Sequence, residues 1–227
     1  MPNDELPEWD RVLSAAAHLQ RILPDAVLVG GTASAAFAKH RLSQDADHVI
    51  GDLRQRFDEI LAQLESVAGW KTARVKRPVL ILGSLDGIET GVRQLIRAIP
   101  LETTQIEHAG QRITVPTEAE ILRIKGALIL KRNATRDYLD FVALAARIGD
   151  LGVVEALKGF DTLYPQDNAE SALMQLQIQL SNPVPFDLDG VRLAEYKFLD
   201  ARWHEWETVR RVCEHIAELI FDRVVGQ

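Results

Sequence analysis

The sequence predicts an α+β protein, in which a mixed sheet with flanking helices is followed by a helical C-terminal part. Two observations lead to this prediction. Short apolar runs typical of strands alternate with amphipathic helical patterns as far as residue 115, and only helical patterns follow from residue 116 onward. We therefore expect two domains, an α/β core at residues 1–115 and a helical domain at residues 116–227.

The chain begins with an amphipathic helix and a strand–turn–helix unit. The stretch PEWDRVLSAAAHLQRILP, residues 7–24, places apolar residues at helical intervals and ends at Pro24. AVLVGG, residues 26–31, is an apolar run that predicts a buried strand ending in a glycine pair. TASAAFAKHRL, residues 32–42, favours a helix, and Thr32 is available as its N-cap.

The next segments predict further strands around one long helix. DADHVI, residues 45–50, has the pattern of a second strand, and residues 52–69 form a helical pattern with one apolar face. RPVLILG, residues 77–83, predicts a third strand. Two more strand-like segments, residues 91–99 and 111–116, complete the mixed region.

The second half of the chain has helical patterns only. Residues 116–133 and 135–149 carry apolar residues three or four positions apart, and Gly149 is the expected C-cap of the second of these helices. A shorter helical piece follows at residues 153–160, and a last amphipathic helix covers residues 203–219.

Composition limits the classes of function. A net charge of −7 argues against a protein that wraps broadly around nucleic acid, although a local basic patch can still contact it. Basic residues cluster at residues 71–77 and 131–136. The first cluster fits either a solvated strand edge or an RNA patch, and the second fits either a helix end or an RNA patch. The single cysteine, Cys213, excludes an internal disulfide framework.

The sequence carries no sign of membrane insertion or export. No apolar run reaches the roughly 18 residues that a membrane span needs. The first residues, MPNDELPEWDR, are acidic and lack the basic and apolar regions of a signal peptide. We therefore expect a cytoplasmic protein with no membrane association.

Two aspartates one residue apart suggest a metal site. Alternate side chains of a strand share one face, so Asp45 and Asp47 are expected to point the same way and Ala46 the other. Two carboxylates on one face repel each other unless a cation neutralises them. Oxygen-rich sites of this kind suit Mg²⁺, or Mn²⁺, completed by substrate phosphates.

The glycine pair supplies the features of a phosphate site. Because they lack β-carbons, Gly30 and Gly31 let a phosphate approach the backbone. The N-terminus of a helix beginning near Thr32 offers unpaired N–H groups and a favourable dipole. Turn and metal together can hold a nucleoside triphosphate. The simpler alternative is a strand–helix turn that needs glycine, followed by solvated carboxylates at a strand end.

The spacing of these residues resembles a known signature. GGT followed by RLSQDAD, with Arg41, Ser43, Asp45 and Asp47 at alternate positions, is similar to the pattern of the polymerase-β-like nucleotidyltransferases. This form of it resembles the branch that contains the AbiEii/AbiGii toxins, which are the toxin components of a class of bacterial toxin–antitoxin and phage-defence systems. A second block, LRIKGALILKRNATRDYLDFVAL at residues 122–144, is similar to that branch's C-terminal pattern.

The resemblance implies a fold and roles for individual residues. It implies a nucleotidyltransferase-like mixed sheet for residues 1–115. Gly30, Gly31 and Thr32 match the turn that binds the nucleotide phosphates, and Asp45 and Asp47 match the two carboxylates that bind divalent metal and take part in catalysis.

The second block adds three further positions. Lys125 matches a lysine expected to contact phosphate or support the reacting centre, and Asp137 matches an aspartate in or near the active site. Asp140 has two interpretations, since it can belong to the site or pair with Arg136 one helical turn earlier.

Other positions carry weaker expectations or depart from the pattern. Arg41 and Ser43 are expected to brace the strand or to touch the nucleotide phosphates. His48 stands where the superfamily usually has an apolar residue, and we expect a buried neutral histidine with one hydrogen bond rather than a metal ligand. The family's third carboxylate, a general base on an adjacent strand, is not identified by spacing, and Asp86 and Glu89 are its candidates.

The resemblance implies transfer of a nucleoside monophosphate from an NTP to a hydroxyl group, with loss of pyrophosphate. The acceptor can be an RNA such as a tRNA end, a protein side chain or a small molecule, and the sequence does not choose among them. A toxin of a toxin–antitoxin pair would also have a cognate antitoxin as a partner. The alternative is a catalytically inactive nucleotide- or protein-binding module on the same fold.

Overall fold

The computed structural model describes residues 6–167 and 170–222, with the side chains of residues 6 and 7 left undescribed. The chain divides into two compact units. The first comprises Met1–Ala33 and Ser43–Thr117, and the second comprises Ser34–Leu42 and Glu118–Gln227. The second unit therefore takes a short segment from the N-terminal half of the sequence, and each unit is described below by itself.

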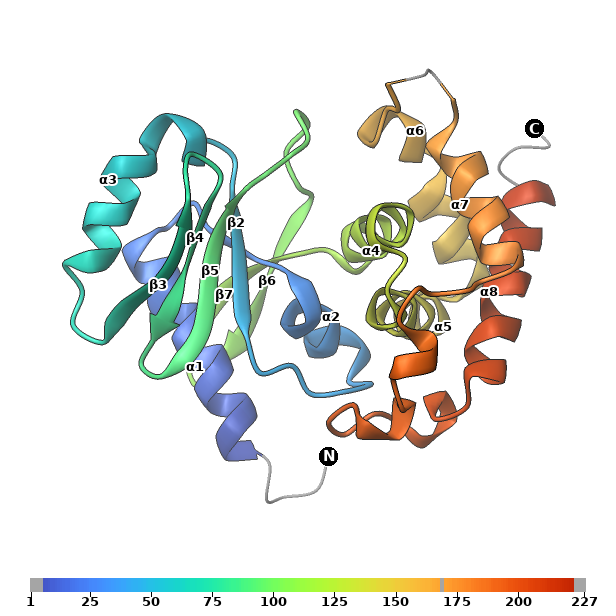
Figure 1. Cartoon of the computed structure of the whole chain (residues 1–227), viewed down its shortest axis with the longest axis horizontal. Coiled ribbons are helices and arrows are strands. Elements are labelled where there is room, and N and C mark those ends of the chain that lie inside the picture. The colour runs from blue at the N-terminus through green and yellow to red at the C-terminus, as the bar shows by residue number, and fades with distance from the viewer. Residues whose placement is uncertain (1–5, 168–169, 223–227) are drawn as a thin grey trace. The chain divides into compact units, whose positions relative to one another are not determined.

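The first unit contains a mixed five-stranded sheet in the order β1–β2–β5–β4–β3, in which β2, β5, β4 and β3 are labelled in Figure 1. Its strands are β1 (Val27–Leu28), β2 (Ala46–Ile50), β3 (Trp70–Lys76), β4 (Leu80–Leu85) and β5 (Ile88–Gln94). Strands β2 and β5 are parallel, and the other neighbouring pairs are antiparallel. The predicted α+β fold class is confirmed.

Helices α1 (Leu6–Ile22) and α3 (Leu53–Glu65) cover one face of this sheet. Both helices contribute apolar residues to one core cluster with the sheet, which includes Leu19 of α1, Phe57 of α3, and Ile50, Ile81 and Val92 of the strands. Burial of this apolar surface is the main favourable contribution to the free energy of folding, and it fixes which face of each strand points toward the helices. The opposite face is called here the polar face.

Strand β3 matches the solvated strand edge that was one of two interpretations of residues 71–77, although periodicity alone does not predict a strand there. Six of its seven residues are exposed, and only Trp70 is buried. Because the strand lies at the edge of the sheet, it shows little of the apolar alternation by which a half-buried strand is recognised. The predicted strand at residues 91–99 also differs from the structure, in which β5 spans Ile88–Gln94.

The first unit also contains a separate hairpin, and the helix after β1 begins earlier than the sequence predicts. Strands β6 (Thr103–His108) and β7 (Gln111–Pro116) form a two-stranded sheet. Gln20 of α1 donates a hydrogen bond to the Thr114 carbonyl and accepts one from the Thr114 N–H. Helix α2 (Gly30–Ala38) begins at Gly30 rather than near Thr32.

The second unit is helical, as the sequence predicts. Its longer helices are α4 (Glu118–Arg132), α5 (Thr135–Leu157), α7 (Ala172–Ser181) and α8 (Trp206–Ile220). The short elements are α6 (Phe160–Leu163), η2 (Leu188–Gly190), η3 (Leu193–Glu195) and η4 (Ala201–Trp203). The end predicted at Gly149 is a break within α5, where that glycine has φ 72° and ψ 170°.

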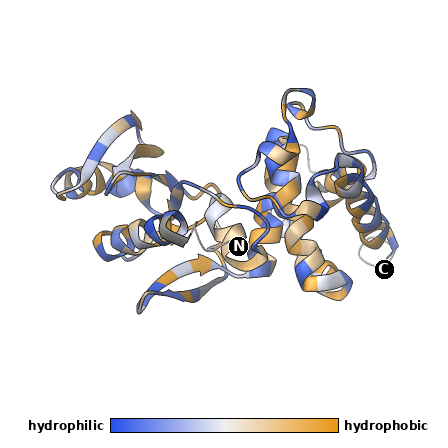
Figure 2. Ribbon diagram, turned by 90° about the horizontal axis from the view of Figure 1, so that it is seen from below, coloured by the Kyte–Doolittle hydropathy of each residue, from blue (hydrophilic) through white to orange (hydrophobic). Residues whose placement is uncertain are grey.

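Hydrogen bonds hold the N-terminal segment within the second unit. The Leu42 N–H donates to the Lys197 carbonyl over 2.8 Å, and the Asp200 N–H donates to the His40 carbonyl over 2.7 Å. Figure 2 shows hydrophobic and hydrophilic residues alternating along the ribbons of both units, as amphipathic patterns require. Within residues 6–167 and 170–222, no helix is long and apolar enough to cross a membrane.

Candidate active site

The two aspartates of the opening motif lie on the polar face of the sheet. Asp47 is in β2 and Asp45 directly precedes it. Ala46, His48 and Ile50 are buried on the side of the helices, whereas Asp45 and Asp47 are partly exposed. The alternation expected from the sequence is therefore present, and the two carboxylates share one face.

Hydroxyl groups fix the backbone around the first aspartate. Ser43 donates a hydrogen bond to Oδ1 of Asp45 over 2.6 Å. The fully buried Thr32 donates its hydroxyl to the Asp45 carbonyl over 2.5 Å, and Thr90 of β5 donates to the Ala46 carbonyl over 2.5 Å. The expectation that Thr32 caps α2 is therefore wrong, because its hydroxyl ties the helix start to the strand that carries the aspartates.

The glycine turn lies against the second aspartate. Gly30 has φ +76°, a conformation that L side chains rarely adopt, and a β-carbon there would lie 3.8 Å from Cβ of Asp47. The Val29 N–H donates to the Asp47 carbonyl over 2.8 Å. The first turn of α2, which contains Gly31, therefore starts beside Asp47, and this arrangement fits an anion held between turn and carboxylate.

A cation and a glycine on β5 border the same carboxylate. Gly91 pairs with Asp47 across the two strands, and a β-carbon on Gly91 would come within 3.3 Å of Oδ1 of Asp47. Nη2 of Arg93 lies 3.6 Å from Oδ2 of Asp47. Neither Gly91 nor Arg93 was singled out from the sequence, because strand pairing brings them to Asp47 and no local motif marks them.

The donor set near Asp45 and Asp47 suits a metal that takes few protein ligands. Among the described residues, no group of three or more His, Cys, Asp or Glu side chains could hold a metal ion. Mg²⁺ is commonly bound by one or two carboxylates, with waters and substrate phosphates completing its shell. Two partly exposed carboxylates beside a glycine turn fit this requirement.

His48 is a buried neutral histidine, as expected. Its side chain is fully buried, and Nδ1 lies 2.8 Å from the Ala46 carbonyl oxygen, to which it donates. Burial lowers the pKa of His48 to about 4, against a smaller opposing effect of this hydrogen bond. Nε2 has no hydrogen-bond partner, so the ring is a space-filling core residue on the side of β2 opposite the carboxylates.

The strand register distinguishes the two candidates for a third carboxylate. Glu89 lies on β5 two residues before Gly91 and therefore on the polar face. The pairing of Ala46 with Thr90, extended by one residue, places Glu89 beside Asp45. Asp86 lies instead in the turn between β4 and β5, where it accepts a hydrogen bond from His18.

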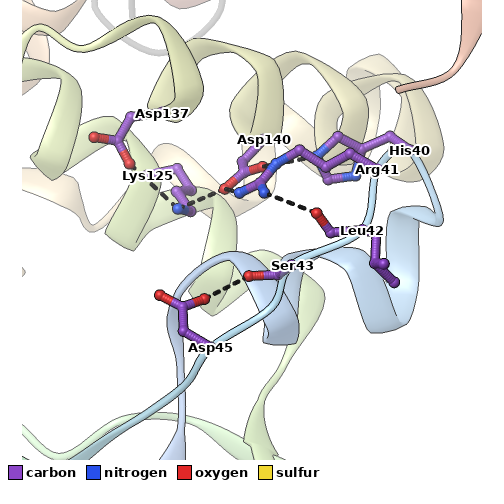
Figure 3. Close-up of polar contacts among 8 residues, drawn as sticks. All are labelled: His40, Arg41, Leu42, Ser43, Asp45, Lys125, Asp137 and Asp140. Carbon is purple, nitrogen blue, oxygen red and sulfur yellow. Dashed lines mark hydrogen bonds and ion pairs between the residues drawn. The ribbon is translucent and has the colours of Figure 1, made fainter. Parts of the chain in front are cut away.

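Lys125 and Asp137 belong to a buried ionic cluster of the second unit (Figure 3). Nζ of Lys125 lies 3.2 Å from Oδ1 of Asp137 and 2.6 Å from Oδ2 of Asp140. Arg41 donates from Nε and Nη2 to the two oxygens of Asp140 over 2.7 and 3.0 Å, and His40 Nε2 lies 2.7 Å from Oδ1 of Asp140. The cluster joins segments about a hundred residues apart in the sequence.

Asp140 is the centre of this cluster. Burial alone would raise its pKa, but the charges of Arg41 and Lys125, with the hydrogen bond from His40, hold the pKa well below its usual value. The suggested pairing of Asp140 with Arg136 is wrong, because Arg136 is exposed and Arg41 occupies the carboxylate. Arg41 donates to Asp140 and Ser43 donates to Asp45, and their expected contact with the nucleotide phosphates stays a prediction.

Solved structures of low sequence identity share this fold. JHP933 from Helicobacter pylori is 15% identical with a TM-score of 0.59, and the match covers 100% of this chain and 96% of that one. A "putative nucleotidyltransferase" from H. pylori is 16% identical over 100% and 98% of the two chains, with a TM-score of 0.56. The chain has a nucleotidyltransferase fold. The structure of ANT(2")-Ia in complex with adenylyl-2"-tobramycin is 12% identical with a TM-score of 0.50, and the match covers 68% of this chain and 98% of that one.

Curated relatives of higher identity are much longer than this chain. The "Heme uptake protein MmpL11" of Mycobacterium tuberculosis is 32% identical over 222 residues, which are 91% of this chain and 22% of the relative. The "Mycolic acid-containing lipids exporter MmpL11" of Mycolicibacterium smegmatis is 31% identical over 121 residues, or 52% of this chain and 12% of the relative. The chain thus spans about a fifth or less of these relatives, and no protein-family model matches it.

The burial of His48 predicts a loss of stability in acid. Because the folded pKa lies below the unfolded value of 6.5, the stability is complete above pH 6.5 and falls as the pH drops toward 4. Between pH 7 and 4, unfolding free energy should fall by about 3 kcal/mol more in the wild type than in His48→Val. Urea unfolding at a series of pH values measures this difference, and parallel curves for the two proteins would contradict the assignment.

The ionic cluster predicts unequal costs for its two aspartates. Asp140→Asn should lower the unfolding free energy by about 3–5 kcal/mol, because Arg41 and Lys125 are left buried with less compensating charge. Asp137→Asn is the matched control and should cost less, because Asp137 pairs with Lys125 only and its Oδ2 has no hydrogen-bond partner. Equal losses in urea unfolding of both variants would show that Asp140 is not the centre of the cluster.

Proposed function

We propose that this protein is a magnesium-dependent nucleotidyltransferase that moves a nucleoside monophosphate from an NTP to a hydroxyl group. The observation that carries the proposal is the placement of Asp45 and Asp47 on one face of β2, directly beside the glycine turn at Gly30. On a nucleotidyltransferase fold, this placement joins a metal-binding pair to a phosphate-binding turn.

Each candidate site residue of the first unit has a role in this proposal. Asp45 and Asp47 hold Mg²⁺, or Mn²⁺, which when bound supplies charge neutralisation for the triphosphate. The backbone of Gly30, Gly31 and Thr32 receives the nucleotide phosphates, with N–H groups at the start of α2 as donors. Arg93, a positive charge close to Asp47, is placed to attract the same phosphates.

Glu89 is the general base in this scheme. It is exposed and stands on the polar face beside Asp45, so it is positioned to accept the proton of the attacking hydroxyl. Lys125 and Asp137 enter the proposal through the sequence resemblance, which matches them to catalytic residues of the family. The partnerless Oδ2 of Asp137 leaves that carboxylate able to accept one more hydrogen bond.

The sequence motifs also support a biological role as a toxin of the AbiEii type, with a cognate antitoxin as partner and the cytoplasm, where NTPs are available, as the place of reaction. The acceptor under this proposal is an RNA or a protein.

A second candidate function, a catalytically inactive nucleotide- or protein-binding module, is favoured by one finding. In the MmpL11 proteins, the matching region is 22% or less of a longer chain named for uptake or export.

The metal pair is tested by calorimetry of NTP binding with and without Mg²⁺. Asp45→Asn/Asp47→Asn should abolish the magnesium-dependent part of NTP binding, because the isosteric amides remove both negative charges. Asp58→Asn/Glu59→Gln on α3 removes the same charge from a helix on the other face of the sheet and should bind as the wild type does. Binding that survives in the first variant, or is absent from the wild type, would sink the transferase proposal.

The general base is tested by comparing two carboxylates on neighbouring positions. Glu89→Gln should lower kcat by about 10²–10⁴-fold and leave KM for the NTP nearly unchanged, because the residue acts on the acceptor hydroxyl. Asp86→Asn should leave kcat within a few-fold of the wild type. Pyrophosphate release in the presence of total tRNA is the measurement, and a larger loss in Asp86→Asn would reverse the assignment.

A further inference from the structure

The edge strand β3 carries a row of exposed basic side chains. This β3 basic row consists of Lys71, Arg74 and Lys76. None of the three makes an ion pair with another residue in the part of the chain that the structure describes. Arg77, which follows them, is different, because it pairs with Asp58 and its guanidinium lies 5.0 Å from the centroid of the Phe57 ring. In a chain of net charge −7, three exposed cations without ion-pair partners among the described residues form a local concentration of positive charge on one strand.

Strand pairing places the β3 basic row on the polar face. Val75 pairs with Ile81 on the core side of the sheet, whereas Arg74 pairs with Leu82 and Lys76 with Leu80. Lys71 pairs with Ser84, which has the same orientation as the two leucines. Because cross-strand partners share a face, all three cations point to the side of the sheet that carries Asp45 and Asp47. The register shift between Thr72 and Arg74 keeps Lys71 on the same side as the other two.

The register also defines three lines of side chains that cross the sheet, each ending in one cation of the row. The middle line runs from Asp47 through Gly91 and Leu82 to Arg74. On one side of it, Val49, Arg93, Leu80 and Lys76 form a second line, and on the other side Glu89, Ser84 and Lys71 form the third. The proposed metal pair and base therefore lie at one end of these lines, and the β3 basic row lies at the other.

The dimensions suit an extended ligand. Three strand spacings separate β2 from β3, which puts the row about 14 Å from the carboxylates, and the row itself extends for about 15 Å along the strand. Leu80 and Leu82 are partly buried between the row and β5 and offer an apolar surface on which a sugar or base can rest. A metal-bound triphosphate at Asp47 is too short to occupy the far end as well.

We infer that the β3 basic row binds the phosphodiester backbone of a single-stranded nucleic acid, which is the acceptor of the transferred nucleotide. This inference rests on the proposed function for the identity of the reaction, but the binding surface is defined by β3 and β4, without the metal pair. Cations at regular intervals beside an apolar strip fit a repeating phosphate backbone with sugars and bases on one side. A nucleic acid bound along the row reaches the carboxylates when its terminal nucleotides turn across the sheet, a distance of about 14 Å.

The test is RNA binding measured by fluorescence anisotropy of a short labelled single-stranded RNA, in EDTA and without NTP. Lys71→Gln/Arg74→Gln/Lys76→Gln should weaken binding at least about tenfold near 50 mM salt. The slope of the logarithm of the binding constant against the logarithm of the salt concentration should become less steep by about two. Arg11→Gln/Arg54→Gln/Arg112→Gln removes three exposed charges of the same unit from outside the sheet strands β1–β5. This control should keep more of the affinity and the slope.

The outcomes separate this inference from the proposed function. RNA binding that is lost only with the β3 basic row supports the inference, even if Asp45→Asn/Asp47→Asn shows no nucleotide-dependent defect. Equal binding by the two triple variants, or none by the wild type, would overturn it while leaving the metal site untouched. If poly-glutamate displaces the RNA as well as unlabelled RNA does, the row fits acidic protein instead and the nucleic-acid assignment fails.

Discussion

The one-sided packing of the five-stranded sheet is the constraint on which the first unit depends. Helices α1 and α3 bury one face, so each strand must direct its apolar residues to that side. The carboxylate of Asp47 in β2 is consequently placed on the other side. His48 illustrates how strict the rule is, because a titratable ring in a core position is held neutral by burial rather than turned toward the carboxylates.

The same constraint converts isolated residues into a surface. Once β2 pairs with β5, β5 with β4 and β4 with β3, alternate residues of four strands face one way. Carboxylates, a glycine, leucines and cations then follow one another across about 14 Å. The charge separation along these lines is the physical basis for reading one end as a metal and phosphate site and the other as a backbone-binding site.

The second unit is organised around buried charge rather than around an alternating pattern. Asp140 gathers Arg41, Lys125 and His40 in an environment where each charge is costly unless it is paired. Because Arg41 comes from the segment that follows α2, this cluster fixes an N-terminal piece of chain within a largely C-terminal unit. The fold itself is shared with nucleotidyltransferases, and function must be argued from such sites, because one fold supports many activities.

Sequence alone determined the fold class, the shared face of Asp45 and Asp47, and the neutral buried state of His48, because each of these follows from periodicity or from residue chemistry within a few positions. It left β3 as one of two interpretations of residues 71–77, because the exposed residues of this strand lack the alternation of a half-buried strand, and it misassigned Thr32 as a cap. The partners of Asp140, the place of Arg93 beside Asp47 and the position of Glu89 on the polar face were decided by tertiary structure. These contacts join residues tens to about a hundred positions apart, and only strand register and helix packing bring such residues together.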